Sequence, residues 1–152
     1  MLKEVLHTAT AAETEAAGAA LATRMLADES IPRFVALFGD LGVGKTAFVR
    51  GFAAVASPTS LVRSPTFALV NEYARGELPL FHFDMYRIES EDDLYSIGFE
   101  DYLAREGIAL VEWSEHILSS LPPHYLAVTI EKDDPNAPDS RSLLIEERNT
   151  LC

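Results

Sequence analysis

Eight consecutive residues, Gly39-Asp40-Leu41-Gly42-Val43-Gly44-Lys45-Thr46, fix how the rest of the chain is interpreted. They match the pattern G-x-x-x-x-G-K-[ST] at every position. The glycines allow the backbone to curl so that successive N–H groups point at phosphate oxygens. Lys45 adds a mobile positive charge, and Thr46 offers a hydroxyl to Mg²⁺, which prefers oxygen ligands. The segment therefore predicts a phosphate-binding loop, or P-loop.

The sequence on either side of this loop supports the same interpretation. An apolar run at residues 33–38 precedes the loop and is typical of a buried strand, and a helical pattern at 44–56 follows it. Such a helix directs the positive end of its dipole at a bound phosphate. A glycine-rich turn that binds no ligand is the alternative, and the order strand, loop, helix argues against it.

The remaining pattern predicts an α/β fold. We expect strands at 3–7, 66–73, 80–83, 108–111, 125–131 and 142–147, helices at 10–27 and from Ser90 onward, and a polar loop at 132–141. Strands and helices alternate early, which favours a central mixed, partly parallel sheet flanked by helices, as in P-loop NTPases. Because we find no repeat, low-complexity tract or linker, we expect residues 1–152 to form a single domain.

Composition and charge restrict the functional classes. The 152 residues are 48% hydrophobic and carry a net charge of −12, which makes the chain a poor candidate for holding nucleic acid unaided. The lone cysteine, Cys152, fits a reducing cytoplasm, and no apolar run approaches the roughly 20 residues of a membrane span. Residues 33–87 contain six bases and four acids. This local excess indicates either chance or a surface that faces an anion.

Two carboxylates are candidates for the metal side of a nucleotide site. Asp84 follows the apolar run at 80–83, and Glu112 follows the buried-strand pattern at 108–111. Acids at the carboxyl ends of strands lie where α/β sheets bind ligands. Glu112 has the better strand before it, whereas Asp84 could position an attacking water. For either acid alone, a surface carboxylate in a turn is the simpler interpretation.

Other polar residues are less informative by themselves. Ser64-Pro65-Thr66 lies between the loop helix and the next strand, where P-loop proteins present a hydroxyl to the γ-phosphate or metal, but from the residues alone a simple proline turn is the better explanation. Trp113 fits either the core or a binding surface. His82, inside an apolar run, is interpreted as a hydrogen-bonded core residue. No spacing of His, Cys and carboxylates suggests zinc.

The absence of certain motifs narrows the chemistry. The chain has neither D-x-x-G nor N-K-x-D, which favours adenine over guanine as the base. It is short for a small-molecule kinase, which needs an acceptor pocket and an arginine-bearing lid. Arg75, Arg87 or Arg141 could supply the arginine, but no insertion has the length of a lid.

Five segments together resemble the TsaE family, which is also called YjeE. They are Gly39–Thr46, Ser64-Pro-Thr-Phe67, His82-Phe-Asp-Met-Tyr-Arg87, Ile97-Gly-Phe-Glu-Asp-Tyr102 and Val111-Glu-Trp113. Their order and spacing match across almost the whole chain. The resemblance implies a bacterial cytoplasmic ATPase that acts with two partner subunits, TsaD and TsaB. These form threonylcarbamoyladenosine beside the anticodon of tRNAs that read codons starting with A, and the ATPase meets tRNA only indirectly.

The same resemblance assigns roles to individual residues. Lys45 and Thr46 bind phosphate and Mg²⁺, Glu112 is the metal-side acid and Asp84 is the other essential carboxylate. Residues 64–66 form a switch-like loop near the γ-phosphate, with Thr66 among the nucleotide-binding residues. Trp113 lies beside the nucleotide, and Arg141 is also counted among the residues that bind it.

Two other functional classes remain as alternatives. One is a free-standing P-loop kinase that phosphorylates a small metabolite or nucleoside. The other is an interaction module that binds ATP as a structural ligand without hydrolysing it. ATP turnover with and without protein partners separates these classes from a partner-activated ATPase.

Overall fold

A computed structural model describes residues 1–40, 42–63, 65 and 69–151. In this part of the chain, none of the helices has both the length and the hydropathy that crossing a membrane requires. The elements, in chain order, are β1 (Lys3–Thr8), α1 (Ala11–Ala27), β2 (Phe34–Phe38), α2 (Lys45–Ala56), β3 (Val70–Tyr73), β4 (Leu80–Asp84), α3 (Glu91–Ser96), α4 (Phe99–Leu103), β5 (Ile108–Glu112), the 3₁₀ helix η1 (Ser114–Ser120), β6 (His124–Asp134) and β7 (Ala137–Asn149).

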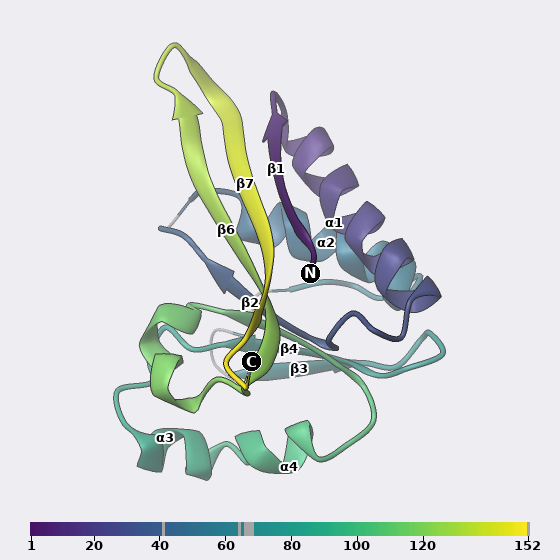
Figure 1. The fold of residues 1–152 in the computed structure, drawn as a ribbon, viewed down its shortest axis with the longest axis vertical. Helices are drawn as coiled ribbons and strands as arrows, with labels where there is room; N and C mark the ends of the chain where they lie inside the picture. The colour runs from purple at the N-terminus through teal and green to yellow at the C-terminus, as the bar shows by residue number, and fades with distance from the viewer. Residues whose placement is uncertain (41, 64, 66–68, 152) are drawn as a thin grey trace.

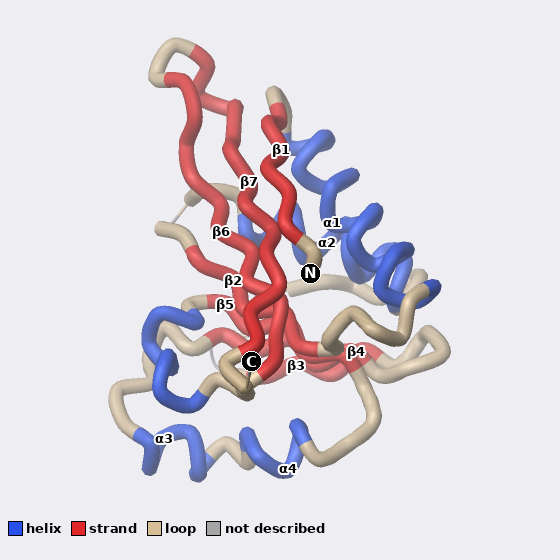
Figure 2. Tube along the Cα trace, in the orientation of Figure 1, coloured by secondary structure: helices blue, strands red, loops and turns tan. Residues whose placement is uncertain are grey.

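Within the described residues, seven strands form one sheet in the order β1-β7-β6-β2-β5-β4-β3 (Figure 2). β2 runs parallel to both β5 and β6, and β4 runs parallel to β5. The pairs β1–β7, β6–β7 and β3–β4 are antiparallel. The predicted α/β fold with a mixed, partly parallel sheet is therefore confirmed.

The central strands are apolar along their whole length because both of their faces are covered. Val35 and Leu37 of β2 belong to the cluster beneath α1 and α2, whereas Phe34 and Ala36 belong to the cluster beneath α3 and α4. Figure 1 shows these two helix pairs on opposite sides of the sheet. In β5, Leu110 faces the first cluster in the same alternation. A strand buried on both faces needs this continuous hydrophobic pattern rather than an alternating one.

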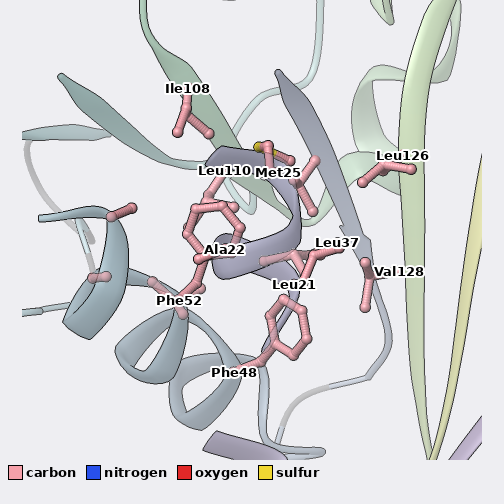
Figure 3. Close-up of a cluster of buried hydrophobic side chains, with 14 of the residues drawn as sticks. Leu21, Ala22, Met25, Leu37, Phe48, Phe52, Ile108, Leu110, Leu126 and Val128 are labelled. Carbon is pink, nitrogen blue, oxygen red and sulfur yellow. The ribbon is translucent and has the colours of Figure 1, made fainter. Parts of the chain in front are cut away.

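Helices α1 and α2 pack closely over the first face. Figure 3 shows their side chains gathered with those of the central strands: Leu21, Ala22 and Met25 from α1, Phe48 and Phe52 from α2, and Leu37, Leu110, Leu126 and Val128 from the sheet. Glycine permits the close approach of the helices, because a Cβ built on Gly51 would lie 1.7 Å from the Glu15 carbonyl oxygen. As predicted, α1 begins after Thr10, whose hydroxyl accepts the N–H of Glu13 at 3.1 Å.

The prediction of a polar loop at 132–141 is wrong. β6 and β7 extend through most of it and meet at a short turn, with Lys132 opposite Arg141 and Asp134 opposite Ala137. This hairpin extends beyond the rest of the sheet (Figure 1), and residues 131–139 are exposed. Both of its faces meet water, so the sequence lacks the apolar alternation that marks a strand. Of the strand expected at 66–73, residues 66–68 lie outside the described part, Leu69 is not in a strand, and β3 covers Val70–Tyr73.

Candidate nucleotide-binding site

The parallel strands bring the predicted loop and both carboxylates to one edge of the sheet. The loop follows β2, Asp84 ends β4 and Glu112 ends β5. In the parallel pair β4–β5, Asp84 is the register partner of Glu112. Neighbouring strands are about 4.8 Å apart, so the two acids lie side by side. This edge, at the carboxyl ends of the strands, is where α/β sheets bind ligands.

The loop has the backbone conformation that its glycines predict. Gly39, Gly42 and Gly44 have φ angles of 142°, 77° and 103°. A Cβ built on Gly39 would lie 2.5 Å from the carbonyl oxygen of Ile130, so β6 packs directly against the loop. Gly44 caps α2, and its carbonyl accepts the first helical N–H, from Phe48, at 3.1 Å. The N–H groups of the first turn have no partner within the helix and are therefore suited to an anion.

Lys45 begins α2 and is held beside the loop. Its side chain is buried, and Nζ donates a hydrogen bond to the Gly39 carbonyl oxygen at 2.6 Å. The same ammonium lies 3.6 Å from the centre of the Trp113 ring, within the range of a cation–π contact. Burial lowers the pKa of Lys45, and the charges of Glu115, Glu112 and Asp84 oppose this shift. The lysine is thus a partly desolvated cation in a ring of acids.

The other loop residues differ in exposure. Asp40 and Thr46 are exposed, and Val43 packs into the core.

Arg141 reaches the loop from β7. Its Nε donates to the Val43 carbonyl at 2.7 Å, and its Nη2 donates to the Gly42 carbonyl at 3.4 Å. The predicted nucleotide contact Arg141 therefore lies at the loop, where it binds the backbone.

Glu112 and Asp84 have different surroundings. Glu112 is 5% exposed, and its Oε2 accepts a hydrogen bond from His82 Nε2 at 2.5 Å. Asp84 is half-buried, and its Oδ1 accepts the N–H of Tyr86 at 2.9 Å. His82 itself is fully buried, and its Nδ1 lies 3.3 Å from the Tyr73 hydroxyl. The interpretation of His82 as a hydrogen-bonded core residue is confirmed, but its partner is a candidate site residue.

Trp113 follows β5 directly and has a left-handed backbone, with φ of 58°. A non-glycine residue in this region is uncommon and is often found at functional sites. The turn places the indole over Lys45. Two further rings pack beside it, from Tyr86 at 5.0 Å and from His116 at 5.5 Å between centroids. Trp113 thus belongs to an aromatic group at the site edge rather than to the interior of the core.

Sequence reasoning missed Glu115. Its Oε2 accepts the Gly39 N–H at 3.3 Å, and its Oε1 is buried without a hydrogen-bond partner among the described residues. A cavity of about 630 Å³ opens beside it, between residues 38–40, where β2 ends and the loop begins, and residues 129–132 of β6. The available signal was its position three residues after Glu112, in the turn that follows a strand ending at the site.

Some predicted residues cannot be placed. Leu41, Ser64 and Thr66 lie outside the described residues. Of the neighbouring residues that are described, Leu69 donates its N–H to the Pro65 carbonyl at 2.9 Å, and Asp84 donates its N–H to the Leu69 carbonyl at 3.0 Å. Leu69 is therefore held at the end of β4, beside the candidate acids.

Comparison with known proteins identifies similar chains. Residues 8–143 match the family described as "Threonylcarbamoyl adenosine biosynthesis protein TsaE". A Bacillus subtilis protein named "tRNA threonylcarbamoyladenosine biosynthesis protein TsaE" is 44% identical over 96 residues. This match covers 63% of this chain and 60% of that protein, so less than two thirds of the relative's length is spanned. A Haemophilus influenzae protein of the same name is 38% identical over 76% of this chain and 71% of its own length.

A solved structure shows the same fold. The crystal structure of Bacillus subtilis YdiB superimposes with a TM-score of 0.75 and 29% sequence identity. The superposition covers 97% of this chain and 86% of that one. The likeness therefore extends over nearly all the elements described above.

Proposed function

The chain belongs to the TsaE family of threonylcarbamoyl adenosine biosynthesis proteins, and from this premise we propose that it binds and hydrolyses ATP in support of tRNA modification. In this proposal, residues 1–152 act as one P-loop ATPase domain in the cytoplasm. Its partners are TsaD and TsaB, which make N6-threonylcarbamoyladenosine next to the anticodon. The observation that carries the proposal is the convergence of the glycine loop, Lys45 and two strand-end carboxylates on one edge of the sheet.

The residues at this edge fit a magnesium nucleotide. The glycine loop packs so closely against β6 that a Cβ at Gly39 would meet the Ile130 carbonyl oxygen, and it is followed at once by the N-terminus of α2. In the described residues, no three His, Cys, Asp or Glu side chains gather to hold a metal by themselves. Mg²⁺ needs no such set, because one or two protein ligands plus phosphate oxygens and water suffice. Thr46 and Glu112 are the protein ligands that we propose.

The work of the chain in hydrolysis divides among a few groups. The N–H groups of the loop and the Lys45 ammonium would bind the phosphates, with Lys45 leaving the Gly39 carbonyl. Bound Mg²⁺ would neutralise charge on the phosphate oxygens. We assign to Asp84 the positioning of the attacking water. We assign to Trp113 the cation–π contact that holds the Lys45 ammonium beside the loop.

The acidic charge of the chain agrees with a division of labour among subunits. At a net charge of −12 the protein is poorly suited to bind a phosphate backbone. The proposed partners would hold the tRNA, and this chain would supply cycles of nucleotide binding and hydrolysis.

Steady-state ATP turnover tests the proposal. The purified chain should hydrolyse ATP slowly alone and faster with the TsaD–TsaB complex. Lys45→Ala should lose about 10²–10³-fold in rate, as is typical when one group that stabilises transition-state charge is removed. Equal rates with and without the partners would contradict the proposal. ADP formation that depends on an added metabolite and needs no partner protein would favour the kinase alternative instead.

A further inference from the structure

We propose that His82 is a positioning residue that sets the orientation of the Glu112 carboxylate, and that Tyr73 holds the His82 ring in place. The inference deepens the proposed function and rests on it, because it assumes that Glu112 faces the metal of a bound nucleotide. His82 lies inside β4, in a run that sequence reasoning assigned to the core.

The contact between His82 and Glu112 is buried and specific. Their side chains are 0% and 7% exposed, and Nε2 lies 2.5 Å from Oε2. A carboxylate only accepts hydrogen bonds, so Nε2 is the donor. Among the described residues, no other side chain donates to this carboxylate. The rotation of the carboxylate, and hence the direction of Oε1, is therefore set by His82.

The other ring nitrogen of His82 leads away from the site to Tyr73. The Tyr73 hydroxyl lies 3.3 Å from Nδ1 and accepts the N–H of Arg63 at 3.2 Å. It also lies 3.2 Å from the Arg63 carbonyl oxygen. Because that backbone is fixed a second time, by the Asn71 side chain at 3.0 Å, the hydroxyl has a defined position. The His82 ring is thus held from both sides.

Sheet register explains why these three residues meet. His82 is the register partner of Asn71 in β3, and Asp84 is that of Glu112 in β5. Tyr73 and His82, like His82 and Glu112, are therefore diagonal neighbours on one face of adjacent strands. Long side chains reach each other at this spacing. The row formed by Tyr73, His82 and Glu112 crosses three strands. It connects the Glu112 carboxylate, the candidate metal ligand, to the backbone of Arg63.

A histidine that served only the core would not need this arrangement. Groups that hydrogen-bond to metal-binding side chains typically change metal affinity by 10–100-fold when they are removed. A purely structural histidine would instead affect the stability of the fold and leave the metal affinity of the folded protein unchanged. The two roles can therefore be separated by measuring metal binding directly.

The test uses Mn²⁺ as a paramagnetic substitute for Mg²⁺, with the full chain saturated with ATP. His82→Phe should weaken Mn²⁺ binding by about 10–100-fold, as measured by electron paramagnetic resonance. ATP affinity in EDTA, measured by calorimetry, should stay within about twofold of the unmodified chain, because the row does not touch the phosphate loop. His82→Gln, which keeps an N–H donor, should recover most of the loss.

The chain offers a matched control. His124 of β6 donates to Glu147 of β7 at 2.6 Å, and neither residue contacts the loop. His124→Gln should leave Mn²⁺ binding unchanged. If His82→Phe does not fold, Tyr73→Phe removes a single oxygen and should weaken Mn²⁺ binding by about threefold, the effect of losing one hydrogen bond.

A double variant shows whether His82 affects Mn²⁺ binding through Glu112 or through a wider disturbance of the fold. If His82 acts through Glu112, His82→Phe should add no further loss of Mn²⁺ affinity in a Glu112→Gln background. Additive losses would overturn the inference, and so would native Mn²⁺ affinity in folded His82→Phe. Absence of metal-dependent ATP binding by the unmodified chain would overturn the proposed function as well, and this result is distinct from the other two.

Discussion

Arg141 connects β7 to the phosphate-binding loop through two neighbouring carbonyl oxygens. A guanidinium can donate to both at once, whereas a lysine ammonium cannot reproduce that planar fork. We predict that Arg141→Lys leaves the fold intact but lowers ATP affinity by about tenfold, the scale of losing one hydrogen bond from a charged group. Calorimetric titration with Mg·ATP measures this change.

The control for Arg141 is an arginine that lies away from the loop. Arg24 of α1 binds Glu4 at 3.0 Å and does not contact the loop. Arg24→Lys should bind ATP as the unmodified chain does. An equal loss in both variants, or native affinity in Arg141→Lys, would show that the contact with the loop carbonyls has no part in binding.

Among individual residues, the sequence predicted those that belong to a recognisable motif. It missed those that reach the site only through the pairing of distant strands. Gly39 to Thr46 follow from their own spacing, and the carboxylates from their places at strand ends. Glu115 and His82 could not be assigned, because their partners, Gly39 and Glu112, are distant in the chain and depend on the β2–β5–β4 order. The site roles of all these residues remain predictions.

Between elements, the packing of α1 against α2 depends on glycine. A Cβ at Gly51 would lie 1.7 Å from the Glu15 carbonyl oxygen, a backbone atom that cannot move aside without shifting α1. We predict that Gly51→Ala destabilises the protein by about 1–3 kcal/mol, typical of overpacking. Helix propensity alone would predict a gain of about 1 kcal/mol. Urea denaturation decides the sign, with Arg50→Ala, exposed on the same helix, as a near-neutral control.

An ion pair ties β3 to the segment after α4 and makes part of the stability depend on pH. Arg105 donates to both oxygens of Glu72 at 2.8 Å, and these hydrogen bonds lower the pKa of Glu72 below its usual 4.5. A carboxyl with a lowered folded pKa contributes stability above about pH 4.5, and the contribution is lost as pH falls through the folded pKa.

We therefore predict that Glu72→Gln is less stable than the unmodified chain at pH 7 and that this difference shrinks toward pH 3. The effect should be small, because exposed pairs contribute little. Urea midpoints at pH 7, 5 and 3 measure it. Glu77→Gln, exposed in the β3–β4 turn, should show no such trend. A difference for Glu72→Gln that is constant across this range would contradict the assignment to the ion pair.

The elements that the sequence predicted best carry a clear local signal, such as a continuous apolar run or a helix cap. β2 and β5 are apolar throughout because helices cover both faces, and α1 carries its cap at Thr10. The outer end of the β6–β7 hairpin, residues 132–141, was missed. There the strands are held by backbone pairing, and their exposed side chains give no periodic signal.

For the whole molecule, the bases of residues 33–87 do not all lie at one edge of the sheet. The excess of bases at 33–87 suggested a surface facing an anion. Lys45 follows β2 and Arg33 precedes it, so they lie at opposite edges of the sheet. At the loop itself, the positive groups are Lys45, Arg141 and the N-terminal end of α2.

The net charge predicts that the chain alone does not retain tRNA. With a net charge of −12, it should bind more weakly than the roughly 10⁻⁴–10⁻⁶ M typical of non-specific nucleic-acid binding at physiological salt. Anisotropy of labelled tRNA should stay flat up to about 100 µM protein, and the TsaD–TsaB complex serves as the positive control. Micromolar affinity that falls steeply with salt would show that this chain contacts the tRNA backbone itself, because only neutralised phosphates release counterions. The division of labour among the proposed subunits would then have to be redrawn.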